Sequence, residues 1–166
     1  MGEVMENLWA PWRMDYILRA GSDKGGCFLC LPPDHLGPDR DRLILYSDPV
    51  VLVIMNLYPY NNGHLMVAPR RHVATLAKAD EEERLALTNQ AARASEILDR
   101  IMAPHGFNMG INQGRVAGGS VEEHLHIHIT PRYLGDNNYM AAIGETKVIS
   151  EHILTTYDKL VPAFNQ

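Results

Sequence analysis

The chain has 166 residues, of which 46% are hydrophobic and 21% are charged, and its formal net charge is −5. This composition is typical of a single globular domain over residues 1–166, and the net charge argues against sequence-independent binding to nucleic acid, so we expect no nucleic-acid partner. The longest apolar runs are too short to cross a bilayer and the first residues lack a signal-peptide pattern, which predicts a soluble cytoplasmic protein with no membrane partner.

The first forty residues are predicted to form an aromatic arm, over 6–20, and then a loop, over 21–40. This loop contains both cysteines of the chain, Cys27 and Cys30. Two thiolates at this spacing can bind one tetrahedral zinc ion when two further ligands come from elsewhere. The Pro- and Gly-rich surroundings favour such a structural zinc over a redox pair, which is typical of a βαβ context. The candidate partners are His35, His72 and His124.

Three short apolar runs separated by turn-forming residues predict strands, and their short links favour antiparallel neighbours. The predicted strands span 42–46, 50–55 and 64–68, with a turn over 58–63 before the last of them. Asp80 and Glu83 then have the spacing of a capping box, which predicts the start of a helix. The expected core stripe of this helix comprises Leu87, Ala91, Ala94, Leu98 and Ile101, and Pro104 and Gly106 are expected to end it.

The remainder of the chain is predicted to contain two further strands and a second helix. The strands span 108–112 and 122–130, a short strand is possible over 147–149, and Ser150 is expected to cap the last helix. The buried face of that helix would carry Ile153, Tyr157 and Leu160. The pattern as a whole predicts an α+β fold in which an antiparallel sheet of about five strands is packed with one long helix and a C-terminal helix.

Three histidines alternate with apolar residues at the end of the last long strand. Because successive side chains of a strand point to opposite faces, His124, His126 and His128 would share one face, with neighbours ~7 Å apart. Imidazoles exchange protons near neutral pH and bind metals, so the run indicates either a phosphate-transfer site or a metal site.

A glycine-rich loop immediately precedes the histidines. Gly114, Gly118 and Gly119 would let backbone N–H groups approach an anion closely, and Ser120 adds a hydroxyl donor. A tight hairpin explains such a loop equally well, but its position favours a phosphate held beside the imidazoles.

The stretch from Asn112-Gln113-Gly114 through Gly118-Gly119-Ser120 to His124-Leu125-His126-Ile127-His128-Ile129-Thr130-Pro131-Arg132 resembles the signature of the histidine triad superfamily of nucleotide hydrolases and transferases. Asn56, Pro59, Gly63-His64, Pro69 and Arg71-His72 resemble its upstream half. The resemblance covers a core over about 25–133, between an N-terminal arm (1–20) and a C-terminal extension (134–166). The segments 8–13 and 135–140 are similar to the branch that contains bacterial diadenosine tetraphosphate phosphorylases.

This resemblance implies an activity and a set of roles. His126 would attack the α-phosphorus of a dinucleoside polyphosphate, and water or phosphate would resolve the nucleotidyl-histidine. His128 would hydrogen-bond the phosphoryl oxygens and the leaving group, and His64 would support the triad from the neighbouring strand. The implied nucleotide- and phosphate-binding residues are Asn56 at the ribose, Asn112, Gly119, Ser120 and His128. The interval from Gly114 to His124 is one residue longer than in small members of the family. The roles of Gly119 and Ser120 are therefore assigned only from their approximate position in the loop.

The zinc-bearing members of the superfamily imply the ligand set Cys27, Cys30, His72 and His124, with His35 as the alternative to His72. Family members often dimerise, so a homodimer is the expected assembly, and no organic cofactor is expected. Two other hypotheses stay open on the sequence: a metalloenzyme whose three histidines bind a catalytic metal, and a nucleotide-binding regulator without turnover. Four arginines could supply positive charge near the pocket, and none is assigned to it. They are Arg70, Arg71, Arg115 and Arg132.

Overall fold

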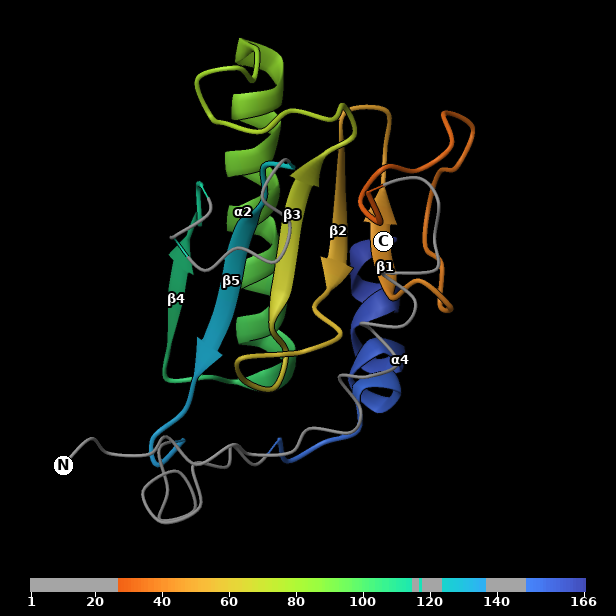
Figure 1. Ribbon diagram of the computed structural model, residues 1–166. Coiled ribbons are helices and arrows are strands. Elements are labelled where there is room, and N and C mark those ends of the chain that lie inside the picture. The colour runs from red at the N-terminus through yellow and green to blue at the C-terminus, as the bar shows by residue number, and fades with distance from the viewer. Residues whose placement is uncertain (1–26, 115–116, 118–123, 137–148) are drawn as a thin grey trace, which may run out of the picture.

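Figure 1 shows the protein as a computed structural model, in which residues 27–114, 117, 124–136 and 149–166 are described. Seven helices and strands follow one another within these ranges. They are β1 (Ile44–Ser47), β2 (Val51–Met55), β3 (Leu65–Pro69), α2 (Glu81–Met102), β4 (Gly106–Gly110), β5 (Ile127–Arg132) and α4 (Ile153–Phe164). The predicted α+β class, with a five-stranded antiparallel sheet, one long helix and a C-terminal helix, is confirmed.

The five strands form one antiparallel sheet in the order β1-β2-β3-β5-β4. Strands β2 and β3 pair along their whole length, from Val51 opposite Pro69 to Met55 opposite Leu65. His128 lies on β5 between Met66 of β3 and Gly110 of β4. Because hydrogen-bonded neighbours hold β5 on both sides, the backbone at His128 is firmly fixed.

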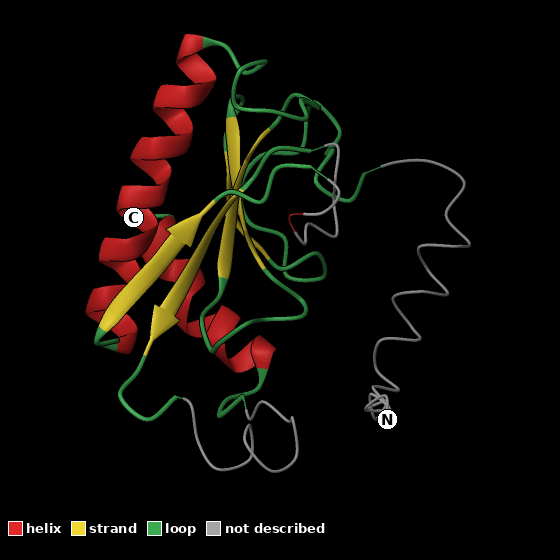
Figure 2. Cartoon of the chain, turned by 60° about the vertical axis from the view of Figure 1, so that its left-hand side comes forward, coloured by secondary structure: helices red, strands yellow, loops and turns green. Residues whose placement is uncertain are grey.

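Both helices lie on the same face of the sheet, as the side view in Figure 2 shows. The capping box predicted for α2 is present: Asp80 Oδ1 accepts from Glu83 N at 2.8 Å, and Glu83 Oε2 accepts from Asp80 N at 2.9 Å. The helix ends where Ala103 adopts a left-handed conformation with φ of 44°. Its buried residues are Glu83, Leu87, Gln90, Ala91, Ala94, Ile97 and Leu98, so the predicted stripe is largely correct, although Ile101 is only half-buried.

The link between β2 and β3 is held against the end of α2 at a glycine. Gly63 has a φ of +78°, a conformation that side chains with a Cβ rarely adopt. A Cβ at this position would lie 2.7 Å from Met102 Sδ. The close approach fixes the hairpin that carries His64 relative to the long helix.

Several predicted boundaries were wrong, and the strand predicted over 42–46 spans Ile44–Ser47. The strand predicted over 122–130 begins only at Ile127, because Pro69 on β3 has no N–H to continue the ladder and its carbonyl accepts from the His124 ring instead. The strand predicted over 108–112 spans Gly106–Gly110, since Gly106 starts the pairing with β5 rather than merely ending the helix.

The start of α4 was also predicted wrongly. His152, not Ser150, caps this helix, because its ring Nδ1 accepts from Leu154 N at 3.3 Å. Tyr157 and Leu160 are buried as predicted, and Ile153 is half-buried. The hydroxyl of Tyr157 donates to the carbonyl of Ile44 at 2.9 Å, which ties the helix to β1.

Several predicted features lie outside the described residues: the aromatic arm, most of the glycine-rich loop and most of the short strand over 147–149. In the part of the chain that is described, no helix has the length and apolar character needed to span a membrane.

Candidate active site

The two cysteines and two histidines from distant parts of the chain meet beside the end of β3. Cys27 Sγ lies 3.2 Å and Cys30 Sγ 3.6 Å from His124 Nδ1, and Cys30 Sγ lies 3.3 Å from His72 Nδ1. The four potential ligand atoms lie within 4.8 Å of one another. Tetrahedral zinc with usual Zn–S and Zn–N bond lengths places S and N about 3.6 Å apart. The cluster therefore has the dimensions of a zinc site.

The protonation of this cluster suits a cation. The Nε2 atom of His124 lies 2.8 Å from the carbonyl of Pro69, which can only accept, so Nε2 carries the proton and Nδ1 keeps its lone pair towards the cysteines. Burial lowers the pKa of His124, which favours the neutral ring that a metal needs. Burial also raises the pKa of the Cys27 thiol to about 11, so a thiolate there requires a neighbouring cation.

His35 lies outside this cluster. Its Nε2 atom is 3.8 Å from Asp39 Oδ2, and it is not one of the four residues whose ligand atoms converge. Of the two alternatives that the sequence left open, His72 is therefore the one that the structure brings to the cysteines.

His126 lies just before β5 and is 2% exposed. Its Nδ1 atom lies 2.7 Å from the backbone carbonyl of His124. Because a carbonyl oxygen only accepts, Nδ1 carries the proton, and the Nε2 atom of the neutral ring keeps its lone pair. The ring packs edge-on against that of His128, with centroids 4.7 Å apart.

His128 is held by a second histidine on the neighbouring strand's hairpin. The backbone N–H of Tyr60 donates to His64 Nδ1 at 3.0 Å, so the proton of neutral His64 is on Nε2. That atom lies 2.9 Å from His128 Nδ1, which must accept, and the proton of neutral His128 is therefore on Nε2. Burial, followed by the neighbouring His126, lowers the pKa of His128 to about 4. His128 is thus a neutral group with an N–H donor on Nε2.

The predicted polar residues flank this pair of histidines. The Asn112 Nδ2 atom lies 3.5 Å from His128 Nε2, and since both nitrogens carry protons in this tautomer, the His128 N–H is not used by Asn112. Asn56 is half-buried at the end of β2, where its Oδ1 accepts from Tyr58 N at 2.9 Å and its backbone N–H donates to the carbonyl of His64 at 3.0 Å. Three further candidates lie outside the described residues. They are Gly119, Ser120 and Arg115.

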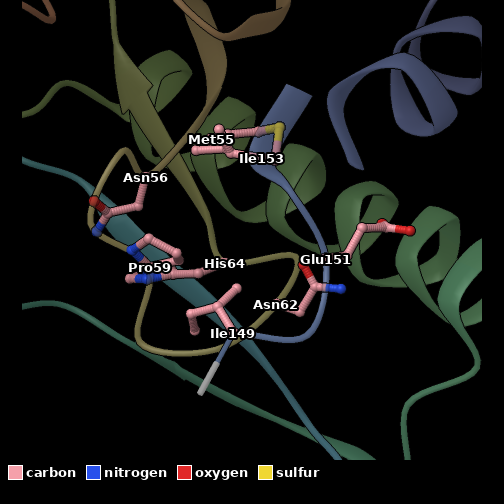
Figure 3. Close-up of a pocket in the computed structure, with 8 residues that line it drawn as sticks. All are labelled: Met55, Asn56, Pro59, Asn62, His64, Ile149, Glu151 and Ile153. Carbon is pink, nitrogen blue, oxygen red and sulfur yellow. The ribbon is translucent and has the colours of Figure 1, made fainter. Parts of the chain in front are cut away.

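Asn56 and His64 also line a cavity of about 230 Å³ (Figure 3). The C-terminal segment lines one part of it with Ile149, Glu151 and Ile153, and most of its surface is apolar. Figure 3 shows Glu151 and Asn62 next to each other on one side of the cavity, and Met55 with Ile153 on another. Residues after the predicted core thus contribute to the wall behind the candidate site.

The described arginines of the candidate set are all engaged by protein groups. Arg70 donates to backbone carbonyls of the cysteine loop and to the Ser47 hydroxyl, each at 2.6 Å. Arg71 forms two hydrogen bonds with the Glu83 carboxylate, at 2.8 and 2.6 Å. Arg132 binds Asp136 in the same two-fold way, at 2.7 and 3.0 Å. The guanidinium groups therefore link β3 and the residues after it to the cysteine loop and to α2, and the end of β5 to the residues that follow it.

The family model described as "HIT domain" matches residues 38–135. The chain belongs to the HIT, or histidine triad, family. A protein named AP-4-A phosphorylase from Mycobacterium tuberculosis is 36% identical over 159 residues, which cover 93% of this chain and 82% of that protein. A bis(5'-adenosyl)-triphosphatase from Dictyostelium discoideum is 33% identical over 93 residues, which cover 56% of this chain and 62% of that protein.

The fold is shared with solved HIT structures. A Zn-bound histidine triad family protein from Mycobacterium smegmatis superposes with a TM-score of 0.61 at 23% identity, covering 74% of this chain and 84% of that chain. The resemblance to the histidine triad family stated from the motifs is therefore confirmed.

Tyr60 and Asn61 contact the site residues but were assigned by the sequence only to a turn. The Tyr60 ring stacks on that of His64, with centroids 4.7 Å apart, and lies 5.7 Å from that of His128. Asn61 is 6% exposed and donates to the carbonyl of Pro131 on β5. A buried asparagine in a turn-forming stretch carries no distinctive spacing, so no sequence signal separated it from its neighbours.

Proposed function

We propose that this protein cleaves dinucleoside polyphosphates of the diadenosine tetraphosphate type through a nucleotidyl-His126 intermediate that phosphate or water resolves. The observation that carries the proposal is the hydrogen bond of 2.7 Å from His126 Nδ1 to the carbonyl of His124, which leaves the Nε2 lone pair available for attack. The names of the Mycobacterium tuberculosis and Dictyostelium relatives support this substrate class.

In the proposed reaction, the lone pair of His126 Nε2 forms a bond to the α-phosphorus as the bond from phosphorus to the bridging oxygen breaks. The ring becomes positively charged, and the hydrogen bond from Nδ1 to the carbonyl of His124 stabilises that charge. An oxygen of phosphate or water then attacks the same phosphorus, and the electrons of the N–P bond return to Nε2. Phosphate gives a nucleoside diphosphate and water gives a nucleoside monophosphate.

The N–H on His128 Nε2 would donate to the phosphoryl oxygens and then to the departing bridging oxygen. His64, whose Nε2 lies 2.9 Å from His128 Nδ1, holds the neutral His128 ring in the tautomer that carries this proton. A donor that is already oriented stabilises charge as it develops without reorganisation. Asn56 at the ribose, and Asn112, Gly119 and Ser120 at the phosphates, complete the proposed binding set.

Zinc is the proposed occupant of the cluster of Cys27, Cys30, His72 and His124. Its donor set of two thiols and two imidazole Nδ1 atoms is one that zinc prefers, and four protein ligands leave no position for substrate. The proposed zinc is therefore structural and joins the cysteine loop to the start of the triad.

A trapping experiment tests the proposed nucleophile. Diadenosine tetraphosphate labelled in the adenosine portion is mixed with the protein, quenched within a turnover and mapped by mass spectrometry. We expect adenylate on His126 and a loss of about 10³-fold or more in kcat for His126→Ala. His152→Asn, which replaces a histidine remote from the triad by another helix-capping residue, is the control and should react normally. Normal turnover by His126→Ala would reject the proposal.

The second acceptor is identified by the products. Diadenosine tetraphosphate incubated with phosphate gives ADP and ATP if phosphate resolves the intermediate, whereas hydrolysis gives AMP and ATP whether or not phosphate is present. Running both conditions and separating the nucleotides distinguishes the two. Tight nucleotide binding without any product across a panel of dinucleoside polyphosphates would instead support a regulator without turnover.

The metalloenzyme alternative makes a different prediction for metal content. In the described part of the chain, the group able to hold a metal is the cysteine cluster, and His124 directs its free Nδ1 there rather than towards His126. Cys27→Ser combined with Cys30→Ser should remove bound zinc completely. Metal that stays in this double variant and is lost only with His126→Ala would support a catalytic metal on the triad instead.

A homodimer is the assembly that we expect in solution. Strand β4 pairs only with β5 among the described strands, and Met109 on it is 48% exposed. An unpaired edge strand offers its N–H and C=O groups to a second copy. Light scattering during gel filtration should give twice the chain mass, and Met109→Lys should shift the protein towards monomer.

A further inference from the structure

A buried asparagine joins the hairpin that carries His64 to the strand that carries His128. The Asn61 side-chain nitrogen donates to the carbonyl of Pro131 at 3.0 Å and to Asp136 Oδ2 at 2.9 Å. Pro131 lies on β5, three residues beyond His128. The two hydrogen bonds therefore span the two segments whose histidines must meet.

The backbone around Asn61 is part of the same arrangement. Its carbonyl accepts from the backbone N–H of His64 at 3.1 Å, and the residue before it, Tyr60, donates its N–H to His64 Nδ1. Its side-chain Oδ1 accepts from Asn62 N at 3.1 Å. Both polar atoms of the Asn61 side chain are thus hydrogen-bonded, Nδ2 to β5 and Oδ1 to the turn. The same turn positions the His64 ring through the hydrogen bond from Tyr60 N.

The acceptor at Asp136 is itself anchored. Arg132 binds this carboxylate through two hydrogen bonds and also donates to Asn108 Oδ1 on β4 at 2.7 Å. The backbone N–H of Tyr133 donates to the same carboxylate at 3.2 Å. The anchor of Asn61 is therefore a rigid corner where β4 and β5 meet rather than a mobile side chain.

We propose that Asn61 is a positioning residue that keeps His64 in hydrogen-bond register with His128, and so keeps the His128 Nε2 proton directed at the leaving-group oxygen. The inference rests on the proposed function, because it assigns a role within that reaction. Without the two side-chain hydrogen bonds, the hairpin can move relative to β5, and the 2.9 Å contact between the two imidazoles lengthens. A shift of about 1 Å in a proton donor costs up to about 10²-fold in rate.

The prediction concerns the leaving group, because a donor matters most where the departing oxygen is basic. Two adenosine monophosphate esters serve as probes: the nitrophenyl ester, whose leaving oxygen is weakly basic, and the phenyl ester, whose more basic leaving oxygen gains more from the His128 hydrogen bond. For Asn61→Ala we expect kcat/KM to fall about tenfold more for the phenyl ester than for the nitrophenyl ester. A general loss of folded protein would lower both values equally.

Asn108→Ala is the matched control, since it removes an asparagine contact from the same arginine on the β4 side without touching the hairpin. It should leave the ratio of the two esters at its wild-type value. Asn61→Ser, which keeps one donor, replaces Asn61→Ala if the latter does not fold, and should change the ratio in the same direction. A ratio unchanged in the Asn61 variants, or changed equally in Asn108→Ala, overturns the inference.

A measurement on the free protein separates this inference from the proposed function. The ¹⁵N shifts of the His128 ring report which nitrogen carries the proton. We expect the wild type to show the proton on Nε2, and Asn61→Ala to show a mixture of the two forms. If the wild type does not cleave diadenosine tetraphosphate, the proposed function fails, while the ring shifts still decide whether Asn61 sets the His64–His128 contact.

Discussion

The pH dependence of stability should reveal the buried neutral state of His128. Burial, followed by the neighbouring His126, lowers the pKa of His128 to about 4, whereas a histidine in the unfolded chain titrates near about 6.5. Between these two values the unfolded chain binds a proton that the folded protein does not bind. The free energy of unfolding therefore falls as the pH falls from about 6.5 to about 4, and above about pH 7.5 this residue contributes no pH dependence.

The size of the effect follows from the two pKa values. At about pH 5, a folded pKa of about 4 and an unfolded pKa of about 6.5 give a loss of about 2 kcal/mol relative to neutral pH. His128 is 9% exposed, and screening by water reduces the expected loss to between about 1 and 2 kcal/mol.

Urea unfolding of the wild type and of His128→Gln measures this contribution, at about pH 7.5 and at about pH 5. The wild type should lose about 1–2 kcal/mol more than the variant between the two conditions. The cysteine cluster and the histidines remote from His128 are present in both proteins, so their contributions cancel in the difference. Equal losses would mean that folded His128 takes up a proton as readily as the unfolded residue, and the reasoning would be refuted.

Three stability predictions concern residues around the site. Arg71→Ala should lower the free energy of unfolding, because it leaves the Glu83 carboxylate, 5% exposed, without its two guanidinium contacts. Adding Glu83→Gln should recover part of the loss, and no recovery would contradict this cause. Gly63→Ala should cost about 1–2 kcal/mol in urea unfolding, and because its φ strain persists, Met102→Ala should relieve only part of that cost. Leu87→Ala, at a fully buried position, should cost about 2–5 kcal/mol in the same assay, and a loss below about 1 kcal/mol would be inconsistent with its burial.

Elements governed by local pattern were predictable from the sequence. The capping box at Asp80 needs only two residues at the right spacing, and the run predicted over 50–55 became β2 at Val51–Met55. The extent of β5 depends on its partner instead. Alternation continues through His124, but a ladder requires an N–H at Pro69, which proline lacks, so the pattern alone overestimated the strand.

In the candidate site, too, some features were predictable from the sequence and others depend on contacts between distant segments. The cysteine spacing left three histidines open as partners and the family resemblance implied His72 and His124, and the structure brings Cys27, Cys30, His72 and His124 together. What the sequence could not give is which nitrogen of each ring is free, because that depends on backbone carbonyls and on the hairpin. The contact of Asn61 with the site was not predictable for the same reason, because it depends on a hydrogen bond to Pro131, 70 residues away along the chain.

Hydrogen bonds at one nitrogen of each ring distinguish the three histidines of the motif. His124 donates from Nε2 to Pro69 and leaves Nδ1 free, whereas His126 donates from Nδ1 to His124 and leaves Nε2 free. His128 accepts at Nδ1 from His64 and keeps a donor at Nε2. The lone pair of His124 faces two cysteines, which suits a metal ligand. The lone pair of His126 lies beside a neutral N–H donor, which suits a nucleophile. The N–H of His128 suits a hydrogen bond to a phosphate oxygen. The proposed roles therefore need no difference in residue type, because the backbone and one neighbouring histidine set the tautomer on which each role depends.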